Sequence, residues 1–334
     1  MNILITGGMG FIGSNFIGHI IDKEDVNNIL NVDCPSRQSS AANKNNVKEF
    51  EKNSKYNFED VWLEHLNHPI GIRKFKDIFE KLEIDTIVHF AAESHVDNSI
   101  TGPRQFILSN IDGTFNLLEF CRNFYPKTRF HHISTDEVYG SLGDEGSFTE
   151  ETPYDPSSPY SASKASSDHL VRAYNRTFKL PITITNCSNN YGPKQHKEKF
   201  IPTIIHSILE NKKIPVYGTG SNIRDWLYVD DHCEAIWNVL KNGKIGDSYN
   251  IGGNCELRNL QVIEEICKQM NVNSGDFVDF VEDRKGHDYR YSIDNSKYLV
   301  QFKNPPKTSF EEGISKTLKY YYDERIHTGQ MGSR

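Results

Sequence analysis

Short apolar runs alternate with longer amphipathic stretches through the first half of the chain. Such runs are typical of buried strands, and the amphipathic stretches are typical of helices that cover a sheet. We expect strands over residues 2–6, 29–33, 86–91, 129–134 and 182–187, and helices over residues 11–21, 104–124 and 159–178. This alternation predicts an α/β protein with a Rossmann-type, doubly wound parallel sheet.

The pattern changes in two places. Residues 35–60 are polar and rich in Asn, Lys and Ser, which predicts a surface excursion without chemistry of its own. From about residue 189 the alternation loosens and Gly and Pro become more frequent, which predicts a smaller C-terminal α/β substrate lobe. We therefore expect a Rossmann domain over residues 1–188, a lobe over residues 189–326 that is interleaved with it, and a disordered tail over residues 327–334.

Composition narrows the possible partners. The 334 residues include 38 Lys and Arg against 45 Asp and Glu, a net charge of -7, which argues against a nucleic-acid partner. An anionic ligand would need a local cationic pocket. The six cysteines show no CxxC pair or metal-ligand spacing, which indicates a reduced chain without a metal site. No signal peptide and no apolar stretch of about 20 residues is visible, so we expect a soluble, cytoplasmic protein with no membrane partner.

A glycine-rich turn follows the first predicted strand. Residues 7–13 read Gly-Gly-Met-Gly-Phe-Ile-Gly and open the first predicted helix. Glycine allows the backbone to approach a pyrophosphate, and the helix N-terminus presents free N–H groups to that anion. Asp33 ends the next strand, where an acid accepts ribose hydroxyls and repels a 2′-phosphate, which favours NAD over NADP; Arg37 weakens that preference slightly. The alternative is a purely structural turn.

Tyr160 and Lys164 are four residues apart on a predicted helix, and so on one face of it. A free tyrosine has a pKa near 10, but a neighbouring ammonium and a positive nicotinamide ring both favour the phenolate, which can then act as a base. The same spacing also occurs on ordinary solvated helices. Its place behind a dinucleotide fingerprint favours the catalytic interpretation.

Thr135, Asp136 and Glu137 follow the predicted strand over residues 129–134. Ligands of open α/β sheets bind at the carboxyl ends of strands, so this segment should face the cofactor. Adjacent residues of a regular strand point to opposite faces, so both acids can serve one substrate only if the strand breaks at about Thr135. Two neighbouring acids in a partly dry cleft tend to have separated pKa values, which suits a reaction that needs an acid and a base. The alternative is an exposed acidic turn.

Together these residues resemble the dTDP-glucose 4,6-dehydratases, a family of extended short-chain dehydrogenases/reductases. The resemblance covers residues 1–322. Its most specific stretches are residues 134–140, 160–164, 186–193, 224–230 and 284–291. The Thr-Asp-Glu triplet separates dehydratases from related sugar 4-epimerases and decarboxylases, which lack the acid pair.

The resemblance implies a reaction in three steps, catalysed by Thr135, Asp136, Glu137, Tyr160 and Lys164. Tyr160 removes the proton of the sugar 4-hydroxyl, which Thr135 holds, while hydride passes from C4 to NAD. Glu137 then removes the C5 proton and Asp136 protonates the departing 6-hydroxyl, so that water leaves. Hydride returns to C6 and Glu137 reprotonates C5, which gives a 4-keto-6-deoxy sugar.

The resemblance also implies the binding residues. The cofactor contacts would be Gly7, Gly10, Phe11, Ile12, Asp33, Ala91, Ala92, Ser94, Ser109, Tyr160, Lys164 and Asn190. The substrate contacts would be Ser94, Thr135, Asn189, Lys199, Pro215, Tyr217, Arg224, Asn254, Arg284 and His287. Arginine forks suit phosphate oxygens and would supply the local cationic pocket. Members usually form homodimers through two helices, here those over residues 104–124 and 159–178, with exposed-looking Leu117, Leu118, Leu170 and Val171; the same residues could simply cover the sheet.

Several positions depart from the family pattern. The run after Asp33 differs from that of the family, and the family's Gly-Asp-Ile, expected near residues 67–70, has no clear counterpart. The family's Gly-Gly-His-Asn-Glu here reads Gly252-Gly253-Asn254-Cys255-Glu256, and Asn98 stands where arginine is common. These departures leave the nucleobase open between dTDP and UDP. Two other functions remain: a nucleotide-sugar 4-epimerase or decarboxylase that uses only Tyr160, and a non-catalytic NAD-binding regulator, although the Tyr–Lys pair is intact.

Overall fold

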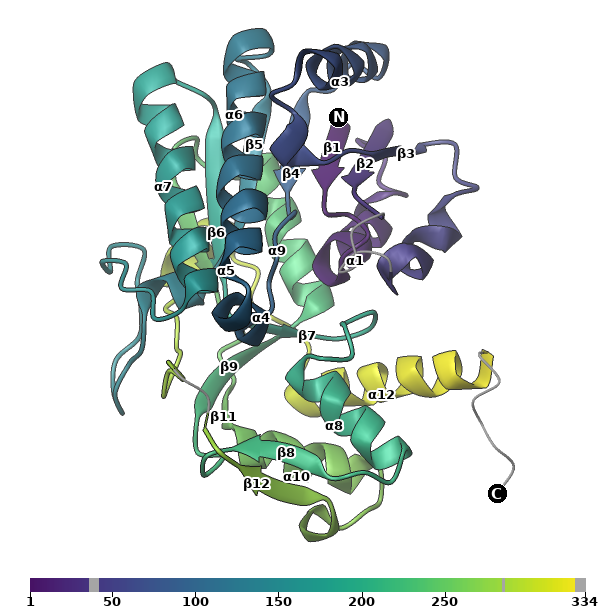
Figure 1. Cartoon of the computed structure of the whole chain (residues 1–334), viewed down its shortest axis with the longest axis vertical. Helices are drawn as coiled ribbons and strands as arrows, with labels where there is room; N and C mark the ends of the chain where they lie inside the picture. Colours follow the sequence, from purple (N-terminus) through teal and green to yellow (C-terminus); the bar gives the residue numbers. More distant parts are fainter. Residues whose placement is uncertain (36–41, 284–285, 328–334) are drawn as a thin grey trace.

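Seven strands form the main sheet of the computed structural model, which describes residues 1–35, 42–283 and 286–327 (Figure 1). Their order is β10-β6-β5-β4-β1-β2-β3, and every pair is parallel. The strands are β1 (Asn2–Thr6), β2 (Asn28–Asp33), β3 (Tyr56–Asp60), β4 (Thr86–His89), β5 (Arg129–Thr135), β6 (Ile182–Cys187) and β10 (Ser248–Ile251). This arrangement confirms the predicted doubly wound α/β fold.

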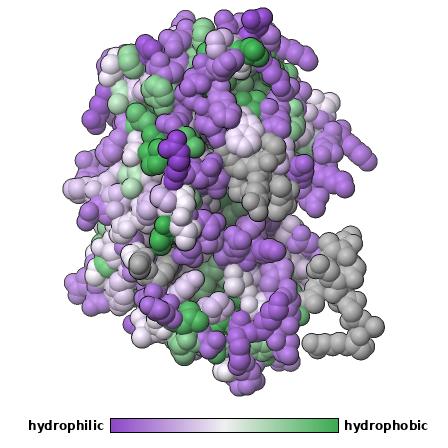
Figure 2. Space-filling model, viewed as in Figure 1, coloured by the Kyte–Doolittle hydropathy of each residue, from purple (hydrophilic) through white to green (hydrophobic). Residues whose placement is uncertain are grey.

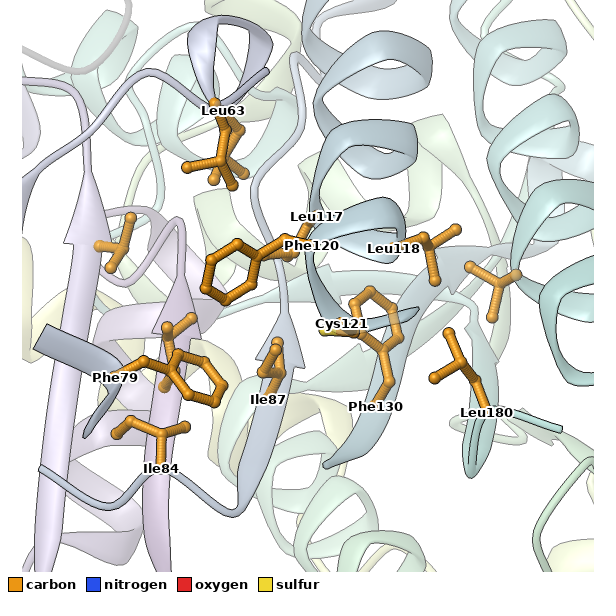
Figure 3. Packing of buried hydrophobic residues seen from close by; sticks show 14 of the residues in the cluster. Leu63, Phe79, Ile84, Ile87, Leu117, Leu118, Phe120, Cys121, Phe130 and Leu180 are labelled. Carbon is orange, nitrogen blue, oxygen red and sulfur yellow. The ribbon is translucent and has the colours of Figure 1, made fainter. Parts of the chain in front are cut away.

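Helices cover both faces of this sheet, so its strands are buried on both sides. Their bounds are α1 (Phe11–Ile20), α3 (Pro69–Lys81), α4 (Val96–Thr101), α5 (Pro103–Phe106), α6 (Gly113–Phe124), α7 (Pro159–Phe178) and α9 (Val229–Asn242). In β1, Leu4 joins one core cluster with α3, α6 and α7, whereas Ile3 and Ile5 join a second with α1 and α9. Figure 3 shows the first cluster, where the Phe79 and Phe120 ring centroids lie 5.4 Å apart.

The predicted helix over residues 104–124 is not continuous. It consists of α5, a π-helix η3 (Ile107–Asp112) and α6. Within η3 the buried Asn110 side chain accepts from Glu93 N at 2.8 Å and donates to Ser163 Oγ at 2.8 Å. These side-chain hydrogen bonds join η3 to α7 and to the loop after β4, and π-helical turns are frequent at functional sites.

The predicted surface excursion over residues 35–60 is wrong in part. Its described residues contain the 3-10 helix η1 (Ala42–Phe50), whose Val47 and Phe50 enter the second core cluster, and the edge strand β3. Asn46 Nδ2 also donates to Met9 O in the glycine-rich turn at 3.0 Å. This segment therefore packs on the predicted cofactor loop. Arg37 lies outside the described residues.

A second group of elements lies below the sheet in Figure 1 and has its own core cluster, which includes Ile204, Trp226 and Ile263. It contains the three-stranded sheet β11-β9-β7, the two-stranded sheet β12-β8 and three helices. The bounds are β7 (Asn189–Tyr191), β8 (Ile214–Tyr217), β9 (Ile223–Tyr228), β11 (Glu256–Arg258), β12 (Val278–Val281), α8 (Phe200–Leu209), α10 (Asn259–Gln269) and α12 (Phe310–His327). Helix α11 (Ser296–Phe302) instead packs against β10 of the main sheet, where its Tyr298 joins a core cluster with Tyr249 and Ile251. The domain division at residue 188 stays a prediction. Helix α12 reaches residue 327, and the rest of the predicted tail lies outside the described residues.

The face seen in Figure 2 is mostly hydrophilic, with hydrophobic residues in small separate groups. None of the helices in the described ranges has the length and apolar character needed to cross a bilayer. The predicted exposure of Leu117, Leu118 and Val171 is wrong: all three are 0 % exposed and cover the sheet. The exposed apolar residues on and beside these helices are instead Ile107, Phe115, Phe124 and Phe178.

Candidate active site

The glycine-rich turn lies where the strand order reverses, between β1 and β4. Crevices at such positions hold ligands in open α/β sheets. Gly7 has a φ of +70°, and a Cβ there would lie 2.7 Å from Ala91 N, so the turn needs glycine. Gly10 is the N-cap of α1 without a side-chain cap, and a Cβ there would meet only the Gly7 carbonyl within 4 Å. The turn and the α1 N-terminus, which includes Phe11 and Ile12, thus have the form of an anion cradle.

Two acids lie side by side at the carboxyl ends of the neighbouring strands. Asp33 accepts from Met9 N at 2.9 Å and from Cys34 N at 2.8 Å, so it is fixed against the glycine turn. Asp60, the last residue of β3, is its register partner. The family's Gly-Asp-Ile run is expected near residues 67–70, and Asp60 is not among the residues that the sequence predicted for the cofactor site. The alternation of aromatic and polar residues in Tyr56–Asp60 was the signal that could have found it.

The segment that carries the acid pair breaks where the sequence predicted. Strand β5 ends at Thr135, and the 3-10 helix η4 (Asp136–Tyr139) begins at the next residue. The Thr135 hydroxyl accepts from Glu137 N at 3.3 Å and donates to Asp136 Oδ1 at 3.2 Å. This cap ends the strict alternation of the strand and joins the Thr135 hydroxyl to the Asp136 carboxyl and to the Glu137 backbone.

The pKa of Asp136 is raised well above its ordinary value, because the side chain is buried and because Glu137 and Asp225 add negative charge. The nearby Arg224 guanidinium and the Thr135 hydroxyl oppose this shift. Asp136 Oδ2 is buried and has no hydrogen-bond partner among the described residues. A raised pKa favours the protonated carboxyl, and one of its oxygens is left for a ligand, which is what a general acid requires.

Tyr160 and Lys164 both lie on α7, which begins with a Ser158 capping box and Pro159. Tyr160 is 7 % exposed, and its pKa is raised well above the ordinary value, mainly by burial and then by Glu137. Lys164 Nζ donates to Ile133 O at 2.8 Å. In the chain without a cofactor, burial and acidic neighbours therefore outweigh any effect of Lys164 on the pKa of Tyr160. Tyr160 can act as a base only if further positive charge is present at the site.

The other predicted cofactor residues lie on the loop after β4, on the π-helix η3 and on β7. Ala91 N donates to Thr6 Oγ1 at 3.2 Å, and Ala92 and Ser94 follow on the same loop after β4. Ser109 lies on the π-helix η3. Asn190, on β7, is held at both ends of its amide: its Oδ1 lies 2.8 Å from His232 Nδ1, and its Nδ2 donates to Ser188 O at 2.9 Å.

The predicted substrate residues come from several elements. Lys199 Nζ donates to Ser94 O at 2.6 Å, which joins the loop before α8 to the loop after β4. Asn189 Oδ1 is buried without a hydrogen-bond partner in the described part of the chain. Pro215 and Tyr217 are exposed on β8, and the Tyr217 ring lies 6.2 Å from that of His287.

Arg224 and Asn254 are the remaining predicted substrate residues in the described part of the chain. Arg224 is 6 % exposed, packs its guanidinium over the Tyr291 ring at 4.3 Å and donates to backbone carbonyls, including Asp288 O at 2.9 Å. Asn254 lines a polar cavity of about 480 Å³ with Asp225, and no other predicted substrate residue is among the described residues of its wall. Arg284 lies outside the described residues. Of the described His, Cys, Asp and Glu side chains, no group of three is placed to hold a metal ion.

Comparison with known proteins identifies the family. The family described as GDP-mannose 4,6 dehydratase matches residues 4–317. A dTDP-glucose 4,6-dehydratase of Haemophilus influenzae is 48 % identical over 341 residues, which cover 96 % of this chain and 98 % of the relative.

Solved structures agree with these matches. The dTDP-glucose 4,6-dehydratase of Bacillus anthracis, solved in complex with NAD, is 42 % identical with a TM-score of 0.87. The enzyme of Streptomyces venezuelae, solved with NAD and dTDP bound, is 38 % identical with a TM-score of 0.88. Each comparison covers 98 % of both chains. The chain thus belongs to the family of dTDP-glucose 4,6-dehydratases.

Proposed function

We propose that this chain converts dTDP-glucose to the 4-keto-6-deoxy sugar with NAD as a bound cofactor, and so acts as a lyase that eliminates water. One observation carries the proposal: a buried Asp136 with a raised pKa lies beside Glu137 at the end of β5, with Tyr160 close enough for a hydrogen bond to Thr135. An acid, a base and a phenol at one place are the groups that oxidation followed by elimination requires.

The chain's own residues fit NAD. Gly7 and Gly10 keep the α1 N-terminus open to a pyrophosphate, and Asp33 and Asp60 stand at the end where adenosine ribose and adenine would bind. NAD, when bound, supplies the transient store for a hydride that leaves C4 and returns to C6. Its positive ring also supplies the charge that the buried Tyr160 phenol needs in order to ionise.

We assign the residue roles that the resemblance to this family implies. Tyr160 takes the proton of the 4-hydroxyl, and Thr135 hydrogen-bonds that hydroxyl. The 4-ketone acidifies the C5 proton, which Glu137 removes. Asp136 then donates its proton to the departing 6-hydroxyl. Glu137 finally returns a proton to C5 and so ends in its starting state. The cycle closes when the proton that Tyr160 took from the 4-hydroxyl replaces the one that Asp136 gave to the leaving water.

We assign the nucleotide end of the substrate to Lys199, Pro215, Tyr217, Arg224 and His287, together with Arg284. Asn189 has an unpaired buried amide oxygen, which favours a role in substrate contact. Asn254 lines a polar cavity with Asp225, and its part in substrate binding stays a prediction. The thymine base is supported by relatives up to 48 % identical over nearly the whole chain.

Incubation with dTDP-glucose in deuterated water tests the reaction. A 4-keto product that carries deuterium at C5 is expected, because C5 is deprotonated and reprotonated. A C4 epimer without a keto product would instead establish a 4-epimerase. UDP-glucose and GDP-mannose, scored for the alkaline absorbance of a 4-keto product, are the matched controls for the base, and turnover of UDP-glucose in preference to dTDP-glucose would reverse that assignment.

We also propose that the chain works as a homodimer in the cytoplasm. Phe115, Phe124 and Phe178 are each at least 39 % exposed on α6 and α7, the helices through which the family usually pairs. Sedimentation of the wild type and of Phe115→Ser tests the pairing: a dimer that the substitution weakens is expected. A wild-type monomer would rule it out.

A further inference from the structure

A buried polar network lies behind the predicted reacting groups, with Asp168 at its centre. Asp168 is 0 % exposed and lies on α7, four residues after Lys164 and eight after Tyr160, so the three residues follow one face of the helix. Its Oδ2 accepts three hydrogen bonds: from Ser134 Oγ at 2.8 Å, Tyr154 OH at 2.8 Å and Asn186 Nδ2 at 3.1 Å. None of the steps assigned above uses this carboxylate.

Lys164 is buried in the same network. It is 5 % exposed, and its ammonium donates to the neutral Ile133 carbonyl. Nε2 of His132 lies 3.5 Å from Lys164 Nζ and 3.2 Å from Asp168 Oδ1. A buried ammonium without an opposite charge tends to lose its proton. Burial does lower the pKa of Lys164, and Asp168 is the largest influence that opposes this shift.

The charge of Asp168 is itself secured. Burial alone would raise the pKa of this carboxyl, but His132, Lys164 and Ser134 outweigh burial and hold the pKa below its ordinary value. The influence is mutual: burial and the charge of Lys164 lower the pKa of the His132 ring, and its contact with Asp168 opposes this shift. The lowered pKa keeps Asp168 ionised, and His132 Nε2 lies between this carboxylate and the nearly buried Lys164 ammonium.

The network also reaches the strand that carries the acid pair. Asn186 Nδ2, which donates to Asp168, also lies 3.2 Å from the Thr135 carbonyl, to which it donates. Ser134 immediately precedes Thr135 in β5. One carboxylate thus connects the helix of Tyr160 to the strand end of Thr135 through two separate contacts.

We propose that Asp168 is a positioning residue for oxidation at C4, because it keeps Lys164 charged beside the phenol and holds α7 in register with the end of β5. The role of Asp168 in oxidation at C4 rests on the proposed function. Its role in maintaining the charge of Lys164 does not depend on that function. The titratable groups that face the Tyr160–Lys164–Asp168 row are His132 on β5, Asp136, Glu137 and Tyr139 on η4, Cys187 on β6, Tyr154 on the loop before α7, and Arg172 on α7.

Side-chain NMR of 15N-lysine tests the charge directly, with the Lys164 signal assigned by its loss in Lys164→Arg. In the wild type, Lys164 is expected to be protonated at pH 7 despite its burial. In Asp168→Asn, which keeps the size of the side chain but not its charge, the lysine pKa should fall by about one unit or more. A neutral lysine in the wild type overturns the proposal without any variant, and an unchanged pKa in Asp168→Asn does the same.

The pH profile of single-turnover cofactor reduction by dTDP-glucose tests the role of Asp168 in oxidation at C4. In Asp168→Asn the midpoint of this profile should move to higher pH by about one unit or more, because a neutral lysine no longer stabilises the Tyr160 phenolate. Tyr154→Phe removes one hydrogen bond to the same oxygen but keeps the charge, so its midpoint should match that of the wild type. If the rate of Asp168→Asn falls by the same factor at every pH, or if its midpoint moves to lower pH, Asp168 is not a positioning residue for oxidation at C4. Wild-type protein that forms no reduced cofactor would refute the proposed function, and the lysine titration would still decide whether Asp168 maintains the charge.

Discussion

The Thr135 hydroxyl donates to Asp136 Oδ1 over 3.2 Å, while Asp136 Oδ2 has no hydrogen-bond partner among the described residues. The first contact fixes the rotation of the carboxyl, and the second oxygen is left to a ligand. A buried polar atom without a hydrogen-bond partner costs about 1–3 kcal/mol of stability, so it indicates a functional role. Proton donation to the leaving 6-hydroxyl of a hexose is such a role.

Asp136→Asn should therefore slow elimination and spare oxidation. The amide keeps the shape and can accept from Thr135, but it has no proton to give. We expect turnover to fall by about 10²–10⁴-fold. Reduced cofactor should still form in a single turnover with dTDP-glucose, measured by its absorbance. Loss of that reduced cofactor as well would show that Asp136 acts in the first step.

The same substitution should change the pH dependence of stability. Because the folded pKa of Asp136 is raised, its neutral form is favoured by folding, and this stabilisation is complete below the unfolded pKa of about 4. It is lost as the pH rises toward the folded pKa, at about 1.4 kcal/mol per unit. The amide of the variant cannot ionise in either state. Urea denaturation at pH 5 and pH 8 should show that Asp136→Asn gains stability relative to the wild type between the two, and an equal difference at both pH values would contradict a raised pKa.

Glu137→Gln should block the step after oxidation. Without a carboxylate to remove the C5 proton, substrate should accumulate as the 4-ketone with reduced cofactor, and no deuterium should enter C5 from deuterated water. Mass spectrometry of the recovered sugar nucleotide measures this. Tyr160→Phe is the matched contrast, because it should abolish cofactor reduction itself. Deuterium uptake by Glu137→Gln at the wild-type rate would assign the C5 base to another residue.

Much of the main sheet and its reacting end could be predicted from the sequence. Strands buried on both faces carry apolar or β-branched residues at most positions, so β1 and β6 are visible without their neighbours. The break after Thr135 follows from a physical requirement, since two consecutive acids cannot face one substrate from a regular strand. Spacing alone placed Tyr160 and Lys164 on one helical face.

What the sequence did not show depends on contacts between distant segments. Edge strand β3 has only half-buried or exposed side chains, so it carries polar residues and its sequence resembles a loop. The π-helix at Ile107–Asp112 shifts the helical register without a Gly or Pro inside it. Leu117 and Leu118 face the sheet rather than solvent, as a result of how α6 packs. The partner of a buried charge is equally hidden, since Lys164 meets His132 from a strand 32 residues away.

Gly7→Ala should destabilise the protein, because Ala would have to adopt a φ of +70° with its Cβ 2.7 Å from the Ala91 amide nitrogen. The left-handed conformation alone costs about 1–2 kcal/mol, and the backbone contact adds to it. Gly143→Ala is the matched control, since a Cβ at this exposed position meets nothing within 4 Å and should change the free energy of unfolding by less than about 0.5 kcal/mol. Chemical denaturation measures both. Because the cradle moves when Gly7 is replaced, calorimetry should also show weaker NAD binding by Gly7→Ala than by Gly143→Ala. Equal stability and equal affinity in the two variants would show that the close approach of the glycine turn to β4 is not required.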